Sequence, residues 1–337
     1  MRASVLRDGR MIYRDDVPEP VPGPGQVLVA VRCCGICGSD LHFAAHGAEV
    51  VELSNRLARD RGGMDLDLNS DVFMGHEFSA EVIEAGPDTD THAPGTLVTS
   101  IPVVLSAKGI EPIVFSNTTL GGYAERMLLS APLLLPLPNG LDVRHAALVE
   151  PMAVGLHAVN KSGIGVAETA LVIGCGPIGL AIIAALRVRG VETIVASDFS
   201  SKRRELATKM GAHQTVDPAQ GSPFDVAKAG VVFEAVGVPG IIDDVLQRAR
   251  NGTRLVVAGV CMQADTVHPF FGIAKEINVQ FVNAYTPEEF ADSLRAIAEG
   301  DIDVAPMITG EVGLDAVGAA FEDLADPERH CKILVTP

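Results

Sequence analysis

Two short clusters of reactive side chains stand near the start of this 337-residue sequence. The first reads Cys-Cys-Gly-Ile-Cys-Gly-Ser-Asp-Leu-His over residues 33–42, and the second reads Gly-His-Glu over residues 75–77. A further acidic residue, Glu150, follows in the string Leu-Val-Glu-Pro. Thiolate, imidazole and carboxylate are the groups that bind zinc, and a catalytic zinc site uses three protein ligands with a fourth position open. These residue types therefore predict a catalytic metal site.

A glycine-rich turn in the second half predicts a dinucleotide site. Residues 169–190 begin with a short apolar run and end with apolar residues at helical spacing, which is typical of strand, turn and helix. The first glycine permits a tight bend, the second lets a pyrophosphate approach the backbone, and the third lets helix pack on strand. Free N–H groups at the helix start attract the phosphates, and proline suits that position. The residues expected here are Gly174, Gly176, Pro177, Ile178 and Gly179.

An acidic residue lies at the expected distance beyond this turn. Asp198 ends the next strand-like run, 198 − 179 = 19 residues past the last glycine, and a carboxylate there accepts the ribose hydroxyls of NAD. The same charge repels the extra phosphate of NADP, although Lys202 and Arg203 stand nearby. Further strand-like and helical runs alternate along this half, which predicts a doubly wound parallel sheet.

The first half instead shows alternating short strands and proline-rich turns, as in a barrel-like β domain. Cys34 and Cys37 also form a Cys-x-x-Cys pair, which is compatible with thioredoxin-like redox chemistry. That alternative leaves His76 and Glu77 without a role. Asp40 is interpreted as a residue that orients a metal ligand.

Taken together, the Cys-Gly-Ile-Cys-Gly-Ser-Asp-Leu-His string, the Gly-His-Glu, the Glu-Pro and the Gly-Cys-Gly-Pro-Ile-Gly resemble the zinc-dependent medium-chain dehydrogenases. The similarity is greatest to the sorbitol and polyol dehydrogenase branch and covers nearly the whole chain. It implies an α/β architecture, with a GroES-like β-barrel catalytic domain and a Rossmann domain of doubly wound parallel sheet. The implied boundaries are 1–150 and 286–337 for the catalytic domain and 151–285 for the NAD domain, with the active cleft between them.

The resemblance also assigns roles to individual residues. Cys37 and His76 match zinc ligands, while Glu77 and Glu150 compete for the remaining place. Ser39 and His42 match the hydroxyl and histidine that carry the released proton to water. The remaining matches are to cofactor contacts, namely Arg203 and Lys332.

Three features depart from the relatives. Since no cysteine stands between Cys37 and Cys175, the four-cysteine lobe that holds a structural zinc is missing, and one zinc per chain is expected with apolar contacts in its place. Cys37 and His76 are 76 − 37 = 39 residues apart, longer than the family needs, and residues 47–72 are interpreted as an insertion that acts as a lid or subunit contact. Phe43 replaces a tyrosine that contacts substrate, which favours a less polar, even cyclic, alcohol.

Composition limits the partners of the protein. Its formal net charge of −17 argues against nucleic acid and anionic membrane. Six unevenly spaced cysteines and the lack of a long apolar stretch favour a cytoplasmic location, and the relatives suggest a homodimer or homotetramer. The predicted function is zinc- and NAD-dependent interconversion of a secondary alcohol and its ketone by hydride transfer. The alternatives are a zinc-free quinone or enoyl reductase of the same fold and a non-catalytic NAD-binding protein.

Overall fold

The computed structural model describes residues 1–58, 63–106 and 109–337, which divide into two compact units. Unit 1 contains Met1–Glu150, Ile308–Asp326 and Lys332–Pro337. Unit 2 contains Pro151–Met307 and Pro327–Cys331. The chain therefore returns to unit 1 twice after completing most of unit 2.

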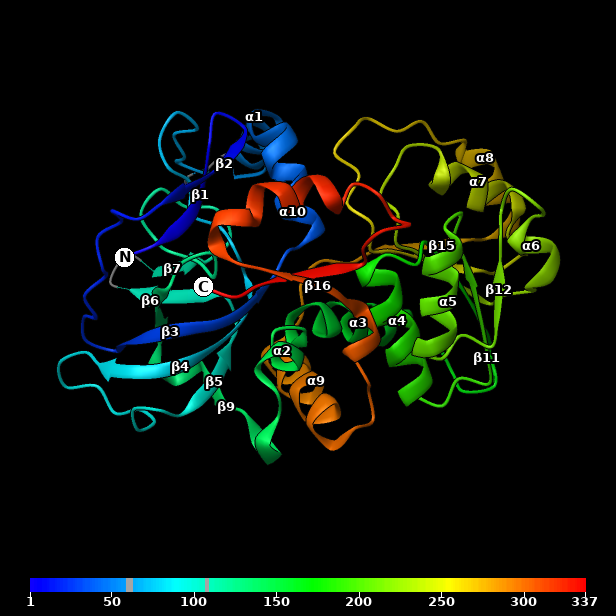
Figure 1. Ribbon diagram of the computed structural model, residues 1–337. Helices are drawn as coiled ribbons and strands as arrows, with labels where there is room; N and C mark the ends of the chain where they lie inside the picture. The colour runs from blue at the N-terminus through cyan, green and yellow to red at the C-terminus, as the bar shows by residue number, and fades with distance from the viewer. Residues whose placement is uncertain (59–62, 107–108) are drawn as a thin grey trace. The chain divides into compact units, whose positions relative to one another are not determined.

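Unit 1 is built on a seven-stranded sheet with the order β16-β17-β3-β4-β5-β9, in which β8 also pairs with β3 (Figure 1). The central strand β3, Gln26–Gly35, buries Val27, Val29 and Val31 as its side chains alternate. The other strands of this sheet are β4 (Glu77–Ala85), β5 (Leu97–Ser100), β8 (Arg126–Ser130), β9 (Leu134–Pro136), β16 (Ile308–Val312) and β17 (Lys332–Val335). Unit 1 also contains two two-stranded antiparallel sheets, β1 (Ala3–Arg7) with β2 (Arg10–Arg14) and β6 (Val103–Ser106) with β7 (Gly109–Pro112).

The insertion predicted at residues 47–72 begins as a continuation of helix α1, Gly38–Ala58, which bends at His46. Beyond the helix, the side chain of Asn117 donates to the carbonyls of Asp67 and Asp71 at 3.0 and 2.9 Å. The apolar residues that the insertion packs against the core of unit 1 are Val50, Val51, Met64, Leu66 and Leu68. Residues 59–62 of the insertion lie outside the described residues. Its role as a lid or subunit contact stays a prediction.

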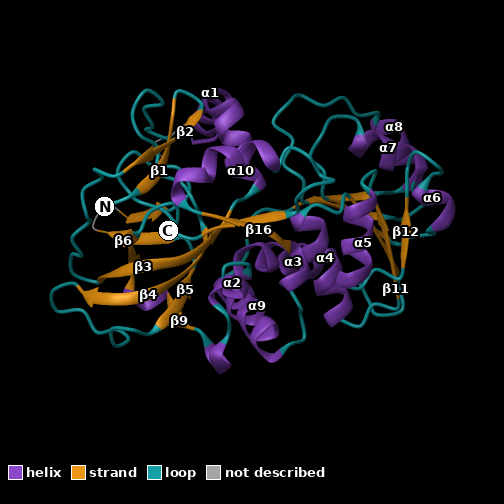
Figure 2. Ribbon diagram, in the orientation of Figure 1, coloured by secondary structure: helices purple, strands orange, loops and turns teal. Residues whose placement is uncertain are grey.

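Unit 2 contains a six-stranded sheet with the order β12-β11-β10-β13-β14-β15, and every neighbouring pair is parallel. Helices cover both sides of this sheet, with α4 and α5 on one side and α7 and α8 on the other (Figure 2). The strands are β10 (Thr169–Ile173), β11 (Thr193–Ser197), β12 (Gln214–Val216), β13 (Val231–Glu234), β14 (Arg254–Val257) and β15 (Asn278–Phe281). The predicted fold class, a barrel-like β domain with a doubly wound Rossmann domain, is confirmed.

The helices are α1 as given, α2 (Val143–Ala146), α3 (Val149–Ser162), α4 (Pro177–Val188), α5 (Ser201–Met210), α6 (Pro223–Val226), α7 (Ile241–Arg248), α8 (Pro269–Lys275), α9 (Pro287–Glu299) and α10 (Val317–Asp323). Single 3-10 turns lie at Ala131–Leu133, Pro138–Gly140, Ala305–Met307 and Leu314–Ala316. Of the helices in the described ranges, none combines the length and apolar character that crossing a bilayer requires.

Helix α9 corrects the domain boundary expected at residue 286. The structure keeps residues 286–307 in unit 2, because α9 is tied to α3 through a buried carboxylate. Glu289 accepts hydrogen bonds from Nδ1 of His157 at 2.7 Å and from Nδ2 of Asn160 at 2.8 Å. It also closes a capping box by accepting the backbone N–H of Thr286, whose hydroxyl accepts the N–H of Glu289 in return.

We expect Glu289→Ala to lower the free energy of unfolding by about 2 kcal/mol, since it removes a cap and leaves His157 and Asn160 without their acceptor. Urea denaturation measures this, with Glu288→Ala, an exposed neighbour on the same helix, as the control. Burial opposes ionisation of Glu289, but its hydrogen bonds outweigh burial and lower its pKa below that of the unfolded chain. The stabilisation is therefore complete above the ordinary carboxyl pKa and is lost as the pH falls through the lowered value. If Glu289→Ala and Glu288→Ala were equally stable, Glu289 would not be the residue that holds α9 against α3.

Candidate active site

Asp40 anchors the beginning of α1 from a completely buried position. Its Oδ2 accepts the backbone N–H of Cys37 at 3.0 Å and the hydroxyl of Tyr123 at 2.6 Å. Both donors are fixed by the backbone or by a buried ring, so the Asp40 carboxylate has one orientation. The loop that carries Cys37 is thereby held against the helix that follows it.

His76 is placed by a close approach of two backbone segments. Gly75 adopts a φ of +98°, which favours glycine, and a Cβ at this position would lie 2.8 Å from the backbone N of Tyr123. The carbonyls of Met74 and Gly75 accept the N–H groups of Tyr123 and Gly122. The local sequence therefore brings His76 next to the segment that carries Tyr123.

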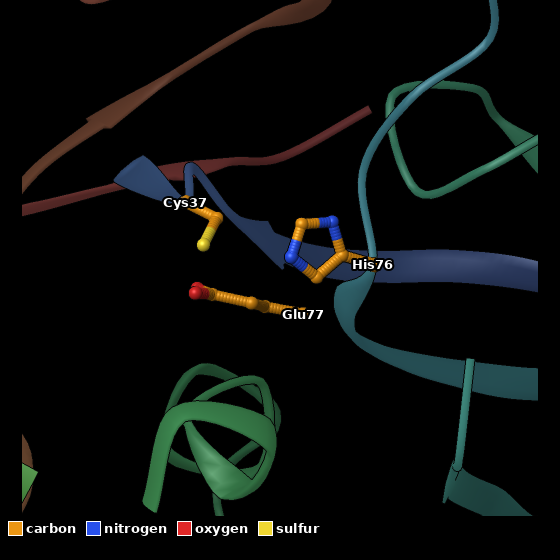
Figure 3. A group of neighbouring side chains, drawn as sticks. All are labelled: Cys37, His76 and Glu77. Carbon is orange, nitrogen blue, oxygen red and sulfur yellow. The ribbon is translucent and has the colours of Figure 1, made fainter. Parts of the chain in front are cut away.

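Cys37, His76 and Glu77 form a group whose ligand atoms all lie within 4.8 Å of one another, and Figure 3 shows their side chains directed toward a common space. Nδ1 of His76 is 3.5 Å from Oδ1 of Asp40, and both atoms are buried without a hydrogen-bond partner. If His76 held a metal through its other ring nitrogen, Nδ1 would carry the proton and could donate it to that carboxylate oxygen. Sulfur, imidazole and carboxylate are also the donor set that zinc prefers, so the residues fit the metal.

Buried acidic groups beside His76 shift the pKa values in this group. Burial disfavours the charged form of His76, but the neighbouring Asp40 and Cys37 outweigh burial and raise its pKa well above the ordinary value, with a further contribution from Glu150. Burial raises the pKa of Asp40, while His76 and the hydrogen bonds from Tyr123 and Cys37 oppose that shift.

Lys332 corrects a sequence-based assignment. It was expected to contact the cofactor, but its ammonium is buried and donates to both carboxylate oxygens of Glu77, at 2.8 and 2.7 Å, and to the carbonyl of Ile36 at 2.9 Å. Lys332 is the first residue of β17, whereas Glu77 begins β4. These bonds match the three protons of an ammonium group, so the structure assigns Lys332 to the support of Glu77.

The remaining predicted catalytic residues are not part of the metal-binding group. Ser39 and His42 are exposed on the first turns of α1, three residues apart and therefore on one face of the helix. Glu150 lies in the first turn of α3 and stands outside the set of ligand atoms that meet within 4.8 Å in the described chain. The relay and the role of Glu150 stay predictions.

Phe43 and Cys34 are both buried in the core of unit 1. Only 1% of Phe43 is exposed, and its ring stacks on Phe115 with centroids 3.9 Å apart, so the side chain packs in the core of unit 1 instead of lining an open pocket. Cys34 is fully buried, and burial raises its thiol pKa well above the ordinary value. A redox cysteine needs an accessible thiolate, so the burial of Cys34 argues against a Cys34–Cys37 redox pair.

The glycine-rich turn has the geometry that a dinucleotide requires. Gly174 has a φ of +91°, and a Cβ there would lie 2.7 Å from Val236. Gly179 lets helix α4 approach the turn, because its Cβ would fall 1.9 Å from the carbonyl oxygen of Gly174. A Cβ on Gly176 would meet nothing within 4 Å, which leaves space beside the N-terminus of α4. That helix begins at Pro177, followed by Ile178, and its N-cap Gly176 provides no side-chain cap.

Asp198 lies directly after β11, where the sequence places it, and its carboxylate connects two loops. Oδ2 accepts the N–H of Cys175 in the glycine-rich turn, and Oδ1 accepts the N–H of Ser200 at the start of α5, both at 2.8 Å. Arg203 lies in the first turn of α5, and its Nε is buried without a hydrogen-bond partner. Burial raises the pKa of the Cys175 thiol, and the positive charge of Arg203 opposes that rise. Arg203 is therefore close enough to the glycine-rich turn to act on it.

Comparisons with known proteins agree with this geometry. The family model for the alcohol dehydrogenase GroES-like domain matches residues 23–139, and that for zinc-binding dehydrogenases matches residues 177–299. An (R,R)-butanediol dehydrogenase of Bacillus subtilis (strain 168) is 30% identical over the full length of both chains. A sorbitol dehydrogenase of Gallus gallus is 27% identical over 90% of this chain and 88% of its own. A crystal structure from Sinorhizobium meliloti 1021, described as a zinc-binding dehydrogenase bound to NADP, has a TM-score of 0.85 and 29% identity, covering 100% and 99% of the two chains.

The two-unit fold and its thiolate, imidazole and carboxylate group thus define a zinc-dependent oxidoreductase that uses a nicotinamide cofactor. The chain belongs to the medium-chain family of zinc-binding alcohol dehydrogenases, in its polyol branch. The sequence singled out the ligands and the glycine-rich turn, but it gave no role to Tyr123. The pair of glycines directly before Tyr123, which allows another backbone segment to approach closely, is the signal that was available.

We expect Tyr123→Phe to weaken zinc binding about 10-fold, because Asp40 loses the hydroxyl that fixes the carboxylate facing His76. Competition for zinc against a chromophoric chelator measures the affinity directly. Tyr13→Phe, which removes an exposed hydroxyl, serves as the control. An unchanged affinity in Tyr123→Phe would show that the Cys37 N–H alone is enough to hold Asp40.

Proposed function

We propose that this protein interconverts a secondary alcohol and its ketone with one zinc ion per chain and NAD as the hydride acceptor. The observation that carries the proposal is the convergence of Cys37, His76 and Glu77 in unit 1, in a chain whose unit 2 has the glycine-rich turn and Asp198. Small vicinal diols and polyols are the first candidate substrates, because relatives of similar length are named butanediol and sorbitol dehydrogenases.

Separate residues of this chain would hold the metal, orient its ligands and transfer the proton. Cys37, His76 and Glu77 would hold the zinc, which when bound supplies a Lewis acid for the alcohol oxygen. Asp40 keeps His76 oriented, and Lys332 keeps the carboxylate of Glu77 in place although it is buried. Oxidation moves a hydride from the alcohol carbon to the nicotinamide ring and releases one proton. Ser39 and His42, exposed on one face of α1, would carry that proton to water.

Glu77 and Glu150, the two candidates for the third zinc ligand, differ in their relation to Cys37 and His76. Glu77 lies inside the group of ligand atoms, and a carboxylate has enough lone pairs to bind Lys332 and a metal together. Glu150 acts on His76 through its charge. We therefore propose Glu77 as the direct ligand, with Glu150 close to the open position.

The choice of NAD and the count of one zinc rest on separate observations. Asp198 presents a carboxylate where the ribose hydroxyls bind, which favours NAD. In the region of the missing cysteine lobe, Ile113 and Val104 are buried and Phe115 stacks on Phe43, so apolar packing supports this segment. A zinc-free reductase would have no use for the metal-binding group, and neither would a non-catalytic NAD-binding protein.

We also propose that the protein is a cytoplasmic homo-oligomer and that it acts on small molecules without binding nucleic acid or membrane. All six cysteines are free thiols, which agrees with a reducing compartment, and the net charge of −17 disfavours polyanionic partners. Strand β15 is the edge of the parallel sheet and is exposed along its whole length, including Val279 and Phe281. An apolar edge strand of this kind pairs readily with the same strand of a second copy.

We expect the purified protein to contain one zinc per chain and to reduce NAD with butane-2,3-diol, sorbitol or a cyclic secondary alcohol. Chelation should abolish turnover, and added zinc should restore it. Cys37→Ala should lose the metal, whereas Cys33→Ala, which changes a thiol buried in β3, should keep it. Metal analysis together with NADH absorbance gives both readouts. A metal-free protein that still turns over would favour the reductase, and a zinc-loaded protein inactive on every alcohol would favour the non-catalytic alternative.

We expect Phe281→Glu to convert the oligomer to smaller species, because a buried like-charge pair would oppose pairing of two β15 strands. Light scattering coupled to gel filtration reports the mass. Val21→Glu, at an exposed apolar position in unit 1, adds the same charge and should leave the mass unchanged. An unaltered mass in Phe281→Glu would place the subunit contact elsewhere.

A further inference from the structure

A short segment near the C-terminus belongs to unit 2, although the residues before and after it belong to unit 1. This segment, Pro327–Cys331, lies at the beginning of α5. The hydroxyl of Ser200 donates to the carbonyl of Pro327 at 3.3 Å. Oε1 of Glu328 accepts the N–H of Ser201 at 2.9 Å, and Oε2 accepts the Ser201 hydroxyl at 3.1 Å.

The first turn of α5 therefore has its donors occupied. Ser200 is the N-cap, and its hydroxyl oxygen accepts the N–H of Arg203. Glu328 takes the N–H of Ser201, and a hydrogen bond from the N–H of Lys202 also helps to lower the pKa of Glu328, after those from Ser200 and Ser201. Each free N–H in the first turn of α5 thus has an acceptor that the protein supplies.

The position of this turn gives the contact a consequence for the cofactor. Asp198 stands just before Ser200, and a carboxylate at this place binds the ribose hydroxyl that carries the extra phosphate in NADP. A phosphate there would need hydrogen-bond donors and positive charge from the adjoining helix start. In this protein the helix start is instead bound to Glu328, so a second carboxylate besides Asp198 contacts the first residues of α5 and its cap.

We propose that Glu328 is a specificity-determining residue that, together with Asp198, selects NAD against NADP by occupying the α5 N-terminus. The proposal rests on the proposed NAD-dependent function and adds a residue from a distant part of the chain to it. Binding of NADP requires Glu328 to leave the Ser201 N–H, whereas binding of NAD leaves that contact intact. Arg203, whose Nε has no hydrogen-bond partner, remains available to the ribose in either case. The question is open in this family, since a relative with 29% identity binds NADP.

The test measures binding of NADH and NADPH to the full-length protein by fluorescence titration, so that it does not depend on a substrate. Glu328→Ala frees the Ser201 N–H and removes the charge, and we expect it to improve NADPH affinity about 10-fold while NADH affinity changes less than about 2-fold. Glu328→Gln removes the charge but keeps one acceptor, and its effect should be smaller in the same direction. Adenosine 2′,5′-bisphosphate, compared with ADP as a competitor of NADH, should show the same gain in Glu328→Ala.

The matched control is Glu205→Ala, which removes an exposed carboxylate one turn further along α5 that makes no hydrogen bond to Ser201 or Asp198. Its NADPH to NADH ratio should stay at the wild-type value. A ratio unchanged in both Glu328 variants, with normal NADH binding, would overturn the proposal and leave the proposed function standing. An equal loss of affinity for NADH and NADPH in the Glu328 variants would also overturn the proposal, because it would show that Glu328 has only a structural role. A wild-type protein that binds neither cofactor would overturn the proposed function itself.

Discussion

The metal-binding unit depends on the burial of Glu77 against Lys332. Both side chains are almost completely removed from solvent, and the ammonium donates to both oxygens of the carboxylate. Charges in such a place are tolerated only when each has its partner, and removing one partner of a buried pair costs about 3–5 kcal/mol. The pair connects β17 to β4 on either side of β3, so the C-terminal strand is required both for the sheet and for the charge balance of the site.

This constraint explains why the two ends of unit 1 must meet. The ligand group supplies Cys37, His76 and Glu77, and Asp40 adds another acidic group behind His76. Without Lys332 this part of the core would contain several acidic groups and no fixed cation. With it, the carboxylate of Glu77 has a fixed partner for its charge, and its remaining lone pairs are available for a metal.

The sequence predicted those parts of the structure that short-range rules determine. The glycine-rich turn and Asp198 follow from strand, turn and helix spacing within 30 residues, and the structure places them as that spacing requires. Long-range packing was not predictable in this way. Helix α9 was expected with the wrong unit because its partner, His157, lies 132 residues away, and Lys332 was misassigned because Glu77 is 255 residues away. A basic residue near a C-terminus looks the same in sequence whether it binds a phosphate or a buried carboxylate.

The same reasoning extends to the segment before β17. Within residues 327–332, Glu328 binds the start of α5 in unit 2 and Lys332 binds Glu77 in unit 1. The opposite charges suit their surroundings. A helix N-terminus carries partial positive charge and accepts a carboxylate, whereas the metal-binding group is acidic and accepts an ammonium. Exchanging the two residues would put like charge against like in both places. The order of Glu328 and Lys332 along the chain is therefore fixed by the two sites that they contact, and neither site reveals that order in its own local sequence.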